Sequence, residues 1–467
     1  MAGIGFRLNK ILFRQTYEAI VQAYGYASLI SSGPWLLAIV ALALIQFFLR
    51  PFISDQDFLF FFSSLTYIFS VSMILTGPAQ MILTRHAADL EYLGESPLIH
   101  RAYFRLTALW TFFATCMGAW FFLGHVYAPP LVLICCTTLF VIISNIWLIA
   151  VCLGGLQSYE KIAMAYGVGY VTSCVGAIIL GVQYGFTWLM VGFLIGQIIL
   201  FLILFKLIHE ELGAPHPKKH TVPNIWQSFL TYWKLALFGF FFYLGIWIDK
   251  FLFWYLDPYA TPVSGLLFAS PLYDQATCIS IISIAPGMAI FFLKVETDFA
   301  IHFRKFFDLV REQATWAQLQ KSKSYIIIAL KKSLLQLIKV QGIISLTFLG
   351  FAHPLAERAG LGTLQTGVFE ILLLAVFVLL MLHALITILF YLDKRFEVML
   401  CSLALLMVNA GCTAWNIFSG TTWYGLGFLL GISAAFVLAA FFVTQGLRHL
   451  EYDTFTSQPL YPKVKNI

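Results

Sequence analysis

The chain has 467 residues, of which 60% are hydrophobic and 11% are charged, and its formal net charge is +6. Soluble domains carry roughly 25% charged residues and have too little polar surface to cover so many apolar side chains. The composition therefore excludes a soluble globular protein and predicts an all-α polytopic membrane protein. A nucleic-acid partner is also excluded, because the basic residues are spread over loops and no domain presents a basic face.

Twelve apolar runs follow one another along the chain, and a membrane-spanning helix needs about 20 mostly apolar residues. The first run is too long for a signal peptide, so we expect the chain to stay whole. The ninth run fits the pattern least well, because it is short and contains Lys339. The predicted transmembrane helices are 19–49, 57–84, 102–128, 130–156, 162–182, 185–208, 230–256, 273–293, 337–355, 364–392, 396–418 and 423–446.

Lysine and arginine collect on one side of this predicted topology. Of the 28 basic residues, only Arg50 and Arg358 lie in loops of the other side, with Lys234 and Lys250 inside helix runs. Positively charged loops stay in the cytoplasm. We therefore expect a multi-pass protein of the bacterial inner membrane with both termini in the cytoplasm.

A polar segment at 209–229, predicted to be a cytoplasmic linker, divides the chain into halves of six helices each. The halves are 1–208 and 230–446, and a cytoplasmic tail follows at 447–467. Because six is an even number, the two bundles share one orientation, as parallel repeats do in many transporters.

Glycine and proline interrupt three of the predicted helices. Proline removes a backbone hydrogen bond and clashes with the preceding turn, and in lipid the freed carbonyl needs another partner. A static kink and a hinge that opens a half-bundle both explain such a pattern. The candidate hinge residues are Gly33, Pro34, Gly77, Pro78, Pro286 and Gly287.

Two charged residues in the seventh helix, Asp249 and Lys250, give the clearest indication of a functional site. A charge at the bilayer centre costs roughly 3 kcal/mol, so both side chains should face the bundle interior or water. They form either a structural ion pair or part of a cargo path, and aromatic rings nearby suit the passage of sugars. The candidate residues of that path are Asp249, Lys250, Asp274, Tyr24, Tyr26, Tyr243 and Trp247.

The segment 297–336 is the longest stretch outside the predicted membrane helices. Its phenylalanines recur at helical spacing opposite charged residues, which is typical of an amphipathic helix on the cytoplasmic membrane surface. It serves either as a surface connector or as a docking site for a cytosolic partner. The candidate docking residues are Phe299, Phe303, Arg304 and Phe307.

The sequence contains no catalytic motif of a hydrolase, metalloprotease or dinucleotide-binding enzyme, and the predicted outer loops are too short for a catalytic site. The eight cysteines all lie inside hydrophobic runs without zinc-finger spacing, and we interpret them as small buried side chains. We therefore expect a protein that is not an enzyme and that uses neither a metal nor a cofactor.

Seven short stretches resemble those of one known family: Met1–Phe6, Gln22–Ala27, Ile30–Trp35, Ile248–Lys250, Leu272–Asp274, Ile284–Pro286 and Val295–Phe299. The family is PelG, the inner-membrane transporters of the Pel exopolysaccharide system, and the resemblance covers nearly the whole chain. Arg7 and Asn9 depart from its pattern at the cytoplasmic end. The resemblance implies the fold of the multidrug/oligosaccharidyl-lipid/polysaccharide (MOP) exporters, in which two six-helix bundles form a V around a cavity.

The resemblance also implies a function and partners. The cargo would be Pel, a partly cationic biofilm polysaccharide rich in amino sugars. The implied partners are a cytosolic glycosyltransferase and membrane proteins of a synthase-dependent complex, one of which senses cyclic di-GMP, together with membrane lipid.

Three other functions stay open. A multidrug antiporter of the same superfamily would use an acid deep in the first helix, where only Ser31, Ser32 and Gln46 are polar. A lipid-linked oligosaccharide flippase needs a basic cavity for pyrophosphate, and Lys250 is the only deep intramembrane cation. A membrane scaffold, which is a different class of protein, would recruit the polysaccharide synthase through 297–336 and carry nothing.

Overall fold

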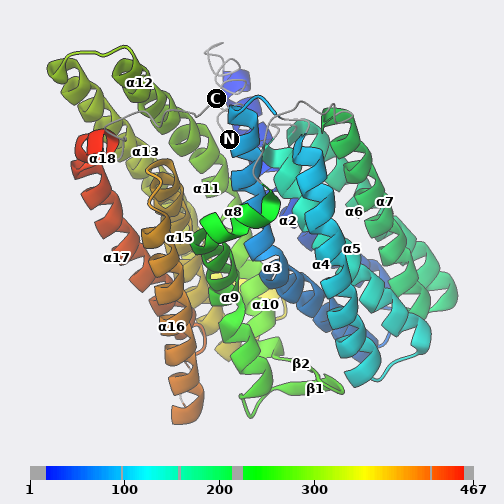
Figure 1. Ribbon diagram of the computed structural model, residues 1–467. Helices are drawn as coiled ribbons and strands as arrows, with labels where there is room; N and C mark the ends of the chain where they lie inside the picture. Colours follow the sequence, from blue (N-terminus) through cyan, green and yellow to red (C-terminus); the bar gives the residue numbers. More distant parts are fainter. Residues whose placement is uncertain (1–16, 96–97, 156–158, 213–223, 421–422, 457–467) are drawn as a thin grey trace.

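The computed structural model describes residues 17–95, 98–155, 159–212, 224–420 and 423–456, and most of them lie in long helices packed side by side (Figure 1). Eleven helices among these residues are long and apolar enough to cross a membrane. The first helix, α2 (Tyr17–Leu49), has a further apolar part at Gly33–Leu49. The protein is thus a multi-pass membrane protein, and its helices agree with the expected count of about twelve.

The N-terminal half forms one hydrophobic core from six membrane helices. After α2 come α3 (Asp55–Tyr92), α4 (Leu98–Gly118) with the π-helical turn η1 (Ala119–Leu123), α5 (Pro130–Gly155), α6 (Tyr159–Tyr184) and α7 (Phe186–Leu212). Local sequence sets some of these boundaries. The Ser54 side chain accepts a hydrogen bond from the Asp57 backbone N–H and so caps the start of α3.

The C-terminal half forms a second hydrophobic core. It begins with α8 (Ile225–Thr231) and α9 (Trp233–Tyr255), and continues with strands β1 (Thr261–Ser264) and β2 (Leu267–Ala269), α10 (Pro271–Ile282), α11 (Ala285–Ile290), η2 (Phe291–Phe299), α12 (Ala300–Arg311), α13 (Trp316–Gly350), α14 (Ala352–Arg358), α15 (Thr363–Tyr391), α16 (Arg395–Ser419), α17 (Leu426–Arg448) and α18 (Leu450–Thr456).

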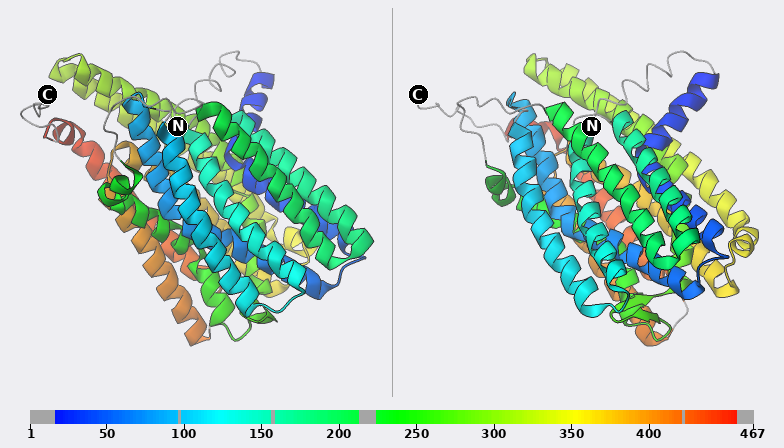
Figure 2. Two further views of the ribbon diagram at one scale, coloured as in Figure 1. Left: turned by 45° about the vertical axis from the view of Figure 1, so that its right-hand side comes forward. Right: turned by 90° about the vertical axis from the view of Figure 1, so that its right-hand side faces the viewer.

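The two ends of the molecule differ. Helix α18 and the start of α2 lie at one end, which we call the terminal side, and the two strands lie at the opposite end, which we call the hairpin side (Figure 1). The antiparallel strands β1 and β2 form a hairpin in the loop between α9 and α10, with Ser264 paired to Leu267. Two further views show that α12 and the beginning of α13 project from the terminal side (Figure 2).

The predicted amphipathic segment contains parts of three helical elements. Residues 297–336 contain the end of η2, all of α12 and the first part of α13, which continues to Gly350. Thr315 and Gln318 form a capping box that starts α13 well before the predicted residue 337. Helix α13 is apolar enough to cross a membrane, so the ninth helix is long rather than short.

The polar segments at 209–229 and 447–467 contain helical parts as well. Helix α7 continues to Leu212, and α8 occupies most of the described end of the first segment. In the tail, Glu451 of α18 forms an ion pair with Lys323 of α13. Residues 213–223 and 457–467 lie outside the described residues.

Only one of the predicted breaks interrupts a helix. Helix α3 runs through Pro78 and α2 runs through Pro34, whereas α10 ends at Ile282 before α11 begins at Ala285, next to Pro286. The indole N–H of Trp110 donates to the Leu75 carbonyl oxygen at 2.9 Å, close to Pro78. Carbonyls near a proline in a membrane helix need such partners.

Candidate functional site

The two halves meet along two seams. Helix α3 of the N-terminal half packs along α9 of the C-terminal half, and α2 packs against α11 and η2. In each case the second membrane helix of one half contacts the first membrane helix of the other, as parallel repeats related by an axis along the membrane normal would. We call the contact of α3 with α9 and the hairpin the long seam, and the contact of α2 with α11 and η2 the short seam.

Two glycines bring the backbones together in the middle of the long seam. A Cβ atom added at Gly239 would lie 2.4 Å from the Gly77 carbonyl oxygen, and one added at Gly77 would lie 2.6 Å from the Gly239 carbonyl oxygen. Beside them the Tyr243 hydroxyl donates to the Gln80 side-chain oxygen at 3.2 Å. The candidate hinge residue Gly77 and the candidate path residue Tyr243 therefore both lie at this seam.

Polar pairs join the terminal end of the long seam. The Tyr232 hydroxyl donates to an Asp89 carboxylate oxygen at 2.7 Å, and His86 Nδ1 lies 2.8 Å from the Ser228 hydroxyl. The guanidinium of Arg395 stacks on the Tyr232 ring at 4.6 Å. These contacts fix α8 and the start of α9 against α3.

The charged pair of α9 lies inside the C-terminal half. Asp249 is fully buried and Lys250 is 7% exposed. The Tyr273 hydroxyl of α10 donates to Asp249 Oδ2, and Lys250 Nζ lies 4.0 Å from the same oxygen. Lys250 Nζ also lies over the rings of Trp247 at 4.8 Å and Phe428 at 5.7 Å. All these partners belong to the C-terminal half, so the pair binds α9 to α10 and α17.

One carboxylate oxygen of this cluster lacks a hydrogen-bond partner in the described part of the chain. Among the described residues, Asp249 Oδ1 is buried without a hydrogen-bond partner. An unpaired buried acceptor is costly, so the arrangement does not satisfy the pair completely. The contribution of Asp249 and Lys250 to a cargo path stays a prediction.

Asp274, another candidate path residue, organises an aromatic contact across the long seam. Its carboxylate accepts a hydrogen bond from the Trp254 indole at 3.0 Å and one from the Ser270 backbone N–H at 3.0 Å. The Trp254 ring stacks on Tyr67 of α3, with centroids 4.3 Å apart and planes 15° apart. Sequence reasoning missed both rings, because each lies in an aromatic-rich run that gives no sign of which ring faces the seam.

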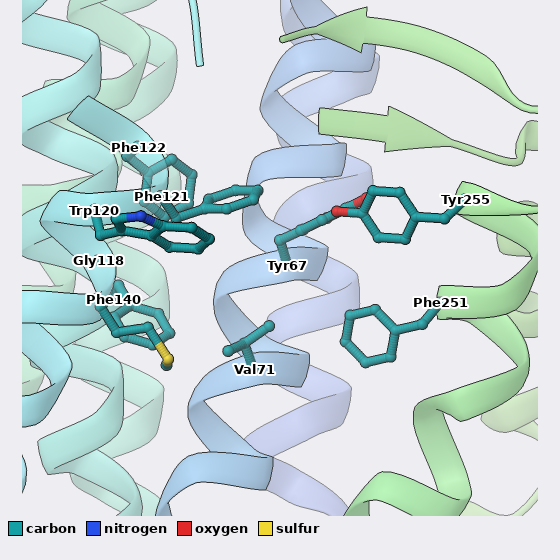
Figure 3. A pocket seen from close by; sticks show the side chains of 10 residues that line it. Tyr67, Val71, Gly118, Trp120, Phe121, Phe122, Phe140, Phe251 and Tyr255 are labelled. Carbon is teal, nitrogen blue, oxygen red and sulfur yellow. The ribbon is translucent and has the colours of Figure 1, made fainter. Parts of the chain in front are cut away.

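An aromatic cavity of about 190 Å³ lies next to this contact, between the two halves (Figure 3). Tyr67 stands in the middle of the close-up, the rings of η1 lie on one side of it, and those of α9 lie on the other. The lining residues are Tyr67, Val71, Met117, Gly118, Trp120, Phe121, Phe122, Phe140, Phe251 and Tyr255. None of them was a candidate at the level of sequence.

The hairpin side of the C-terminal half also holds a buried tyrosine. Tyr424 stacks on Phe253, with ring centroids 4.9 Å apart. Burial and the nearby carboxylate of Asp257 raise the pKa of Tyr424 above its ordinary value. The hydroxyl therefore stays protonated at neutral pH.

The short seam contains the remaining hinge candidates. Gly33 is buried and Pro34 is half-buried in α2. Gly287 has no room for a side chain, because a Cβ atom there would lie 2.2 Å from Gln341 Oε1. Gln341 Nε2 donates to the Ser283 carbonyl oxygen at 3.0 Å and so satisfies a backbone group at the break beside Pro286.

Several candidates lie elsewhere or are not described. Tyr24 and Tyr26 belong to α2, but their side chains lie outside the described part of the structure. Phe299 was assigned to a docking face, which is wrong in this structure, because its ring is fully buried and packs on Tyr391 with centroids 5.4 Å apart. Phe303 and Phe307 are half-buried, and Arg304 is exposed.

The described residues offer no metal site: no group of three or more His, Cys, Asp or Glu side chains could hold an ion there.

The fold is that of the MOP superfamily transporters. An outward-facing multidrug resistance MATE family transporter of that superfamily is 13% identical and gives a TM-score of 0.61, over 91% of this chain and 96% of that one. The Vibrio cholerae MATE transporter VcmN in its bent form is 12% identical and also gives 0.61, over 97% and 99%. A MOP superfamily transporter from Pyrococcus furiosus is 13% identical and gives 0.57, over 91% and 95%. At these identities the likeness shows the fold alone.

The sequence itself identifies the family. Residues 1–455 match the profile of PelG, which is described as "Putative exopolysaccharide Exporter (EPS-E)". Because the match spans most of the chain, the protein belongs to the PelG family. No curated protein matches the sequence at a significant level.

Proposed function

We propose that the protein transports a Pel-type exopolysaccharide, rich in amino sugars, across the bacterial inner membrane. The family supports a polysaccharide as the cargo, and the MOP transporter fold supports transport rather than catalysis. The observation that carries the proposal is the pair of seams between the two halves. Two repeats that meet through equivalent helices can move against each other about a fixed site, as transporters built from repeats do.

We place the terminal side in the cytoplasm. Basic side chains of this side include Arg85, Lys323, Lys394 and Arg395. Among the described residues, the hairpin side has few basic side chains, and Arg358 in α14 is one of them. The positive-inside rule then puts both termini in the cytoplasm and the hairpin outside the inner membrane.

Movement between the halves would use the rigid parts of each half. Asp249, Lys250 and Tyr273 hold α9 and α10 together, so these helices would move as one body. Gly77 and Gly239 form the close contact about which such a body can tilt. This arrangement provides alternating exposure of a path between the halves without a covalent step.

The partners of the proposed complex are a cytosolic glycosyltransferase that makes the polymer and membrane proteins that include a cyclic di-GMP sensor. The projecting α12 and α13 provide a surface for such a partner (Figure 2). The exposed face of α12 carries Arg304, Lys305 and Arg311. With Phe299 buried, docking would rely on these charged side chains rather than on the phenylalanines.

The test is secretion by a strain that lacks this gene but keeps the synthase. We expect wild-type protein to restore extracellular amino-sugar polymer, with membrane levels checked by immunoblot. The Asp249→Asn/Lys250→Gln variant tests the buried pair in the same strain. Extracellular polymer in the deletion strain at the wild-type level would contradict the proposal.

The same strain separates the other functions. A lipid-linked oligosaccharide flippase would leave a lipid-linked precursor in the membrane when deleted, and a multidrug antiporter would change drug susceptibility with unchanged polymer. A scaffold would need only the surface of α12 and α13 (Ala300–Arg311 and Trp316–Gly350). Substitutions at the Gly77–Gly239 contact would then leave secretion unchanged.

A further inference from the structure

The hairpin of the C-terminal half crosses the long seam and binds the N-terminal half. The Leu266 backbone N–H donates to the His125 carbonyl oxygen at 3.0 Å, and the Tyr127 backbone N–H donates to the Ser264 hydroxyl at 2.9 Å. The Ser264 hydroxyl in turn donates to the Tyr127 carbonyl oxygen. These bonds join the turn of the hairpin to the loop between η1 and α5.

Glycine at the tip makes this contact possible. Gly265 has φ +56°, and a Cβ atom there would lie 1.9 Å from the His125 carbonyl oxygen. Any side chain at this position therefore pushes the hairpin off the loop. The nearest atoms to this added Cβ all belong to His125 and Val126 of the loop, so a single methyl group should release the hairpin.

The docked hairpin lies beside the aromatic cavity (Figure 3). The Phe268 backbone N–H donates to the Tyr67 hydroxyl at 3.3 Å, and the Tyr255 hydroxyl donates to the Leu266 carbonyl oxygen at 3.1 Å. Both tyrosines line the cavity. The hairpin thus occupies the polar groups at the rim, while the walls below are rings.

The cavity has the chemistry and size for one sugar ring. Small-ligand sites combine apolar walls with a few polar groups that fix orientation. Its volume of about 190 Å³ is below the roughly 300 Å³ at which sites for drug-sized ligands begin, so it holds one ring rather than a stretch of polymer. The face of a tryptophan or tyrosine also attracts a cationic amino group.

We propose that this cavity binds one amino-sugar ring of the exported polymer, and that the hairpin covers the site between transport events. This inference rests on the proposed function for the identity of the sugar. When the hairpin lifts, the hydroxyls of Tyr67 and Tyr255, which line the cavity, become free for the sugar. A lipid acyl chain needs the rings but not this polar rim.

The first experiment releases the hairpin by Gly265→Ala. The matched control is Gly360→Ala, because Gly360 has φ +74° and no atom near the added Cβ, so it carries the backbone strain without the clash. Ser264→Ala is a milder release variant that keeps the turn glycine. The readout is labelling of Val71→Cys by a membrane-impermeant maleimide added outside intact cells, with Cys116 and Cys278 replaced by serine.

We expect labelling of Cys at position 71 to rise several-fold in Gly265→Ala, to rise less in Ser264→Ala and to stay at the wild-type level in Gly360→Ala. Equal labelling in the parent protein and in the three variants would contradict the proposal that the hairpin covers the cavity. It would show that the cavity is either permanently open or not covered by the hairpin.

The second experiment measures binding of a glucosamine oligomer to the full-length protein in nanodiscs by calorimetry. In the Gly265→Ala background, we expect Tyr67→Leu to weaken binding about tenfold, because a ring contact of about 1.4 kcal/mol is lost. Tyr67→Phe keeps the ring and should weaken binding less. Absence of oligomer binding in Gly265→Ala, or equal binding in Tyr67→Leu, would overturn the sugar site.

Brominated lipids test the other occupant. If an acyl chain fills the cavity, they will quench the fluorescence of Trp254, which is buried and stacks on Tyr67. The quenching will be seen as a difference from Trp254→Phe, and the oligomer will not reverse it; that result would also overturn the sugar site. Labelling and binding do not depend on secretion. If the wild-type protein fails to restore secretion of the polymer, the proposed function is wrong, whatever the labelling and binding show. If secretion is restored but the oligomer does not bind, only the proposed sugar site in the cavity is wrong.

Discussion

The long seam and the short seam join equivalent helices of the two halves, yet they are built differently. The long seam is joined at three levels, by the Tyr232–Asp89 pair, by the Gly77–Gly239 contact, and by stacked rings with the hairpin. In the short seam, α2 meets α11 and η2, which lie toward the terminal side of the broken eighth helix. The hairpin end of α2 instead belongs to the N-terminal core, where Leu49 is fully buried.

The difference shows that two repeats of one fold need not be joined in the same way at their two contacts. The long seam has close backbone contact and polar bonds, which resist separation. The short seam contains the helix break at Pro286, where a backbone interruption allows a change of angle. We therefore expect α3 and α9 to stay together at the Gly77–Gly239 contact of the long seam, while the hairpin lifts and the short seam changes.

The largest effect is expected at the glycine contact. Gly239→Leu places a side chain against the Gly77 carbonyl, so the halves cannot approach and polymer secretion should fall below detection. Gly411→Leu is the matched control, because nothing lies near a Cβ atom there. Full secretion by stable Gly239→Leu would show that the long seam need not be closed.

The buried pair should give the next largest effect, on stability. Asp249→Leu leaves Lys250 buried without its carboxylate, which costs about 3 kcal/mol in buried pairs, and thermal unfolding in nanodiscs should shift accordingly. Asp249→Leu/Lys250→Met removes both charges and should recover most of the loss. If the double variant is stable but secretes no polymer, the pair has a transport role beyond holding α9 to α10.

Substitutions of two prolines, one in each seam, compare the seams directly. Pro286→Ala restores a backbone N–H at the helix break, whereas Pro78→Ala acts within the continuous α3. We expect Pro286→Ala to reduce the secretion rate several-fold and Pro78→Ala to change it little. The reverse order would place the moving hinge in the long seam.

The smallest effect on the protein itself is expected at the projecting helices that continue from the short seam. Arg304→Glu changes an exposed side chain, so the stability should change by about 0.5 kcal/mol or less. Co-purification of the glycosyltransferase should fall if α12 is its docking surface. Unchanged co-purification would remove this surface from the proposed complex.

The membrane helices could be predicted from sequence because lipid acts on each segment separately. A helix in lipid must be apolar over its whole length, so the membrane helices could be located from the apolar runs. The ninth helix was predicted too short because its first turns are polar enough to look like a surface segment, although Thr315 caps them. The burial of Phe299 was missed for a related reason, since an amphipathic pattern does not tell whether protein or membrane covers the apolar face.

The sequence by itself determined the membrane class, the order of the helices and the residues that are chemically unusual in lipid, such as Asp249 and Pro286. The tertiary structure alone decided which faces meet: Gly239 against Gly77, Trp254 against Tyr67, and the hairpin across the seam. The physical reason is that a membrane helix such as α9 is apolar all round, so its sequence carries no stripe that marks the buried face. Only packing against specific neighbours selects that face.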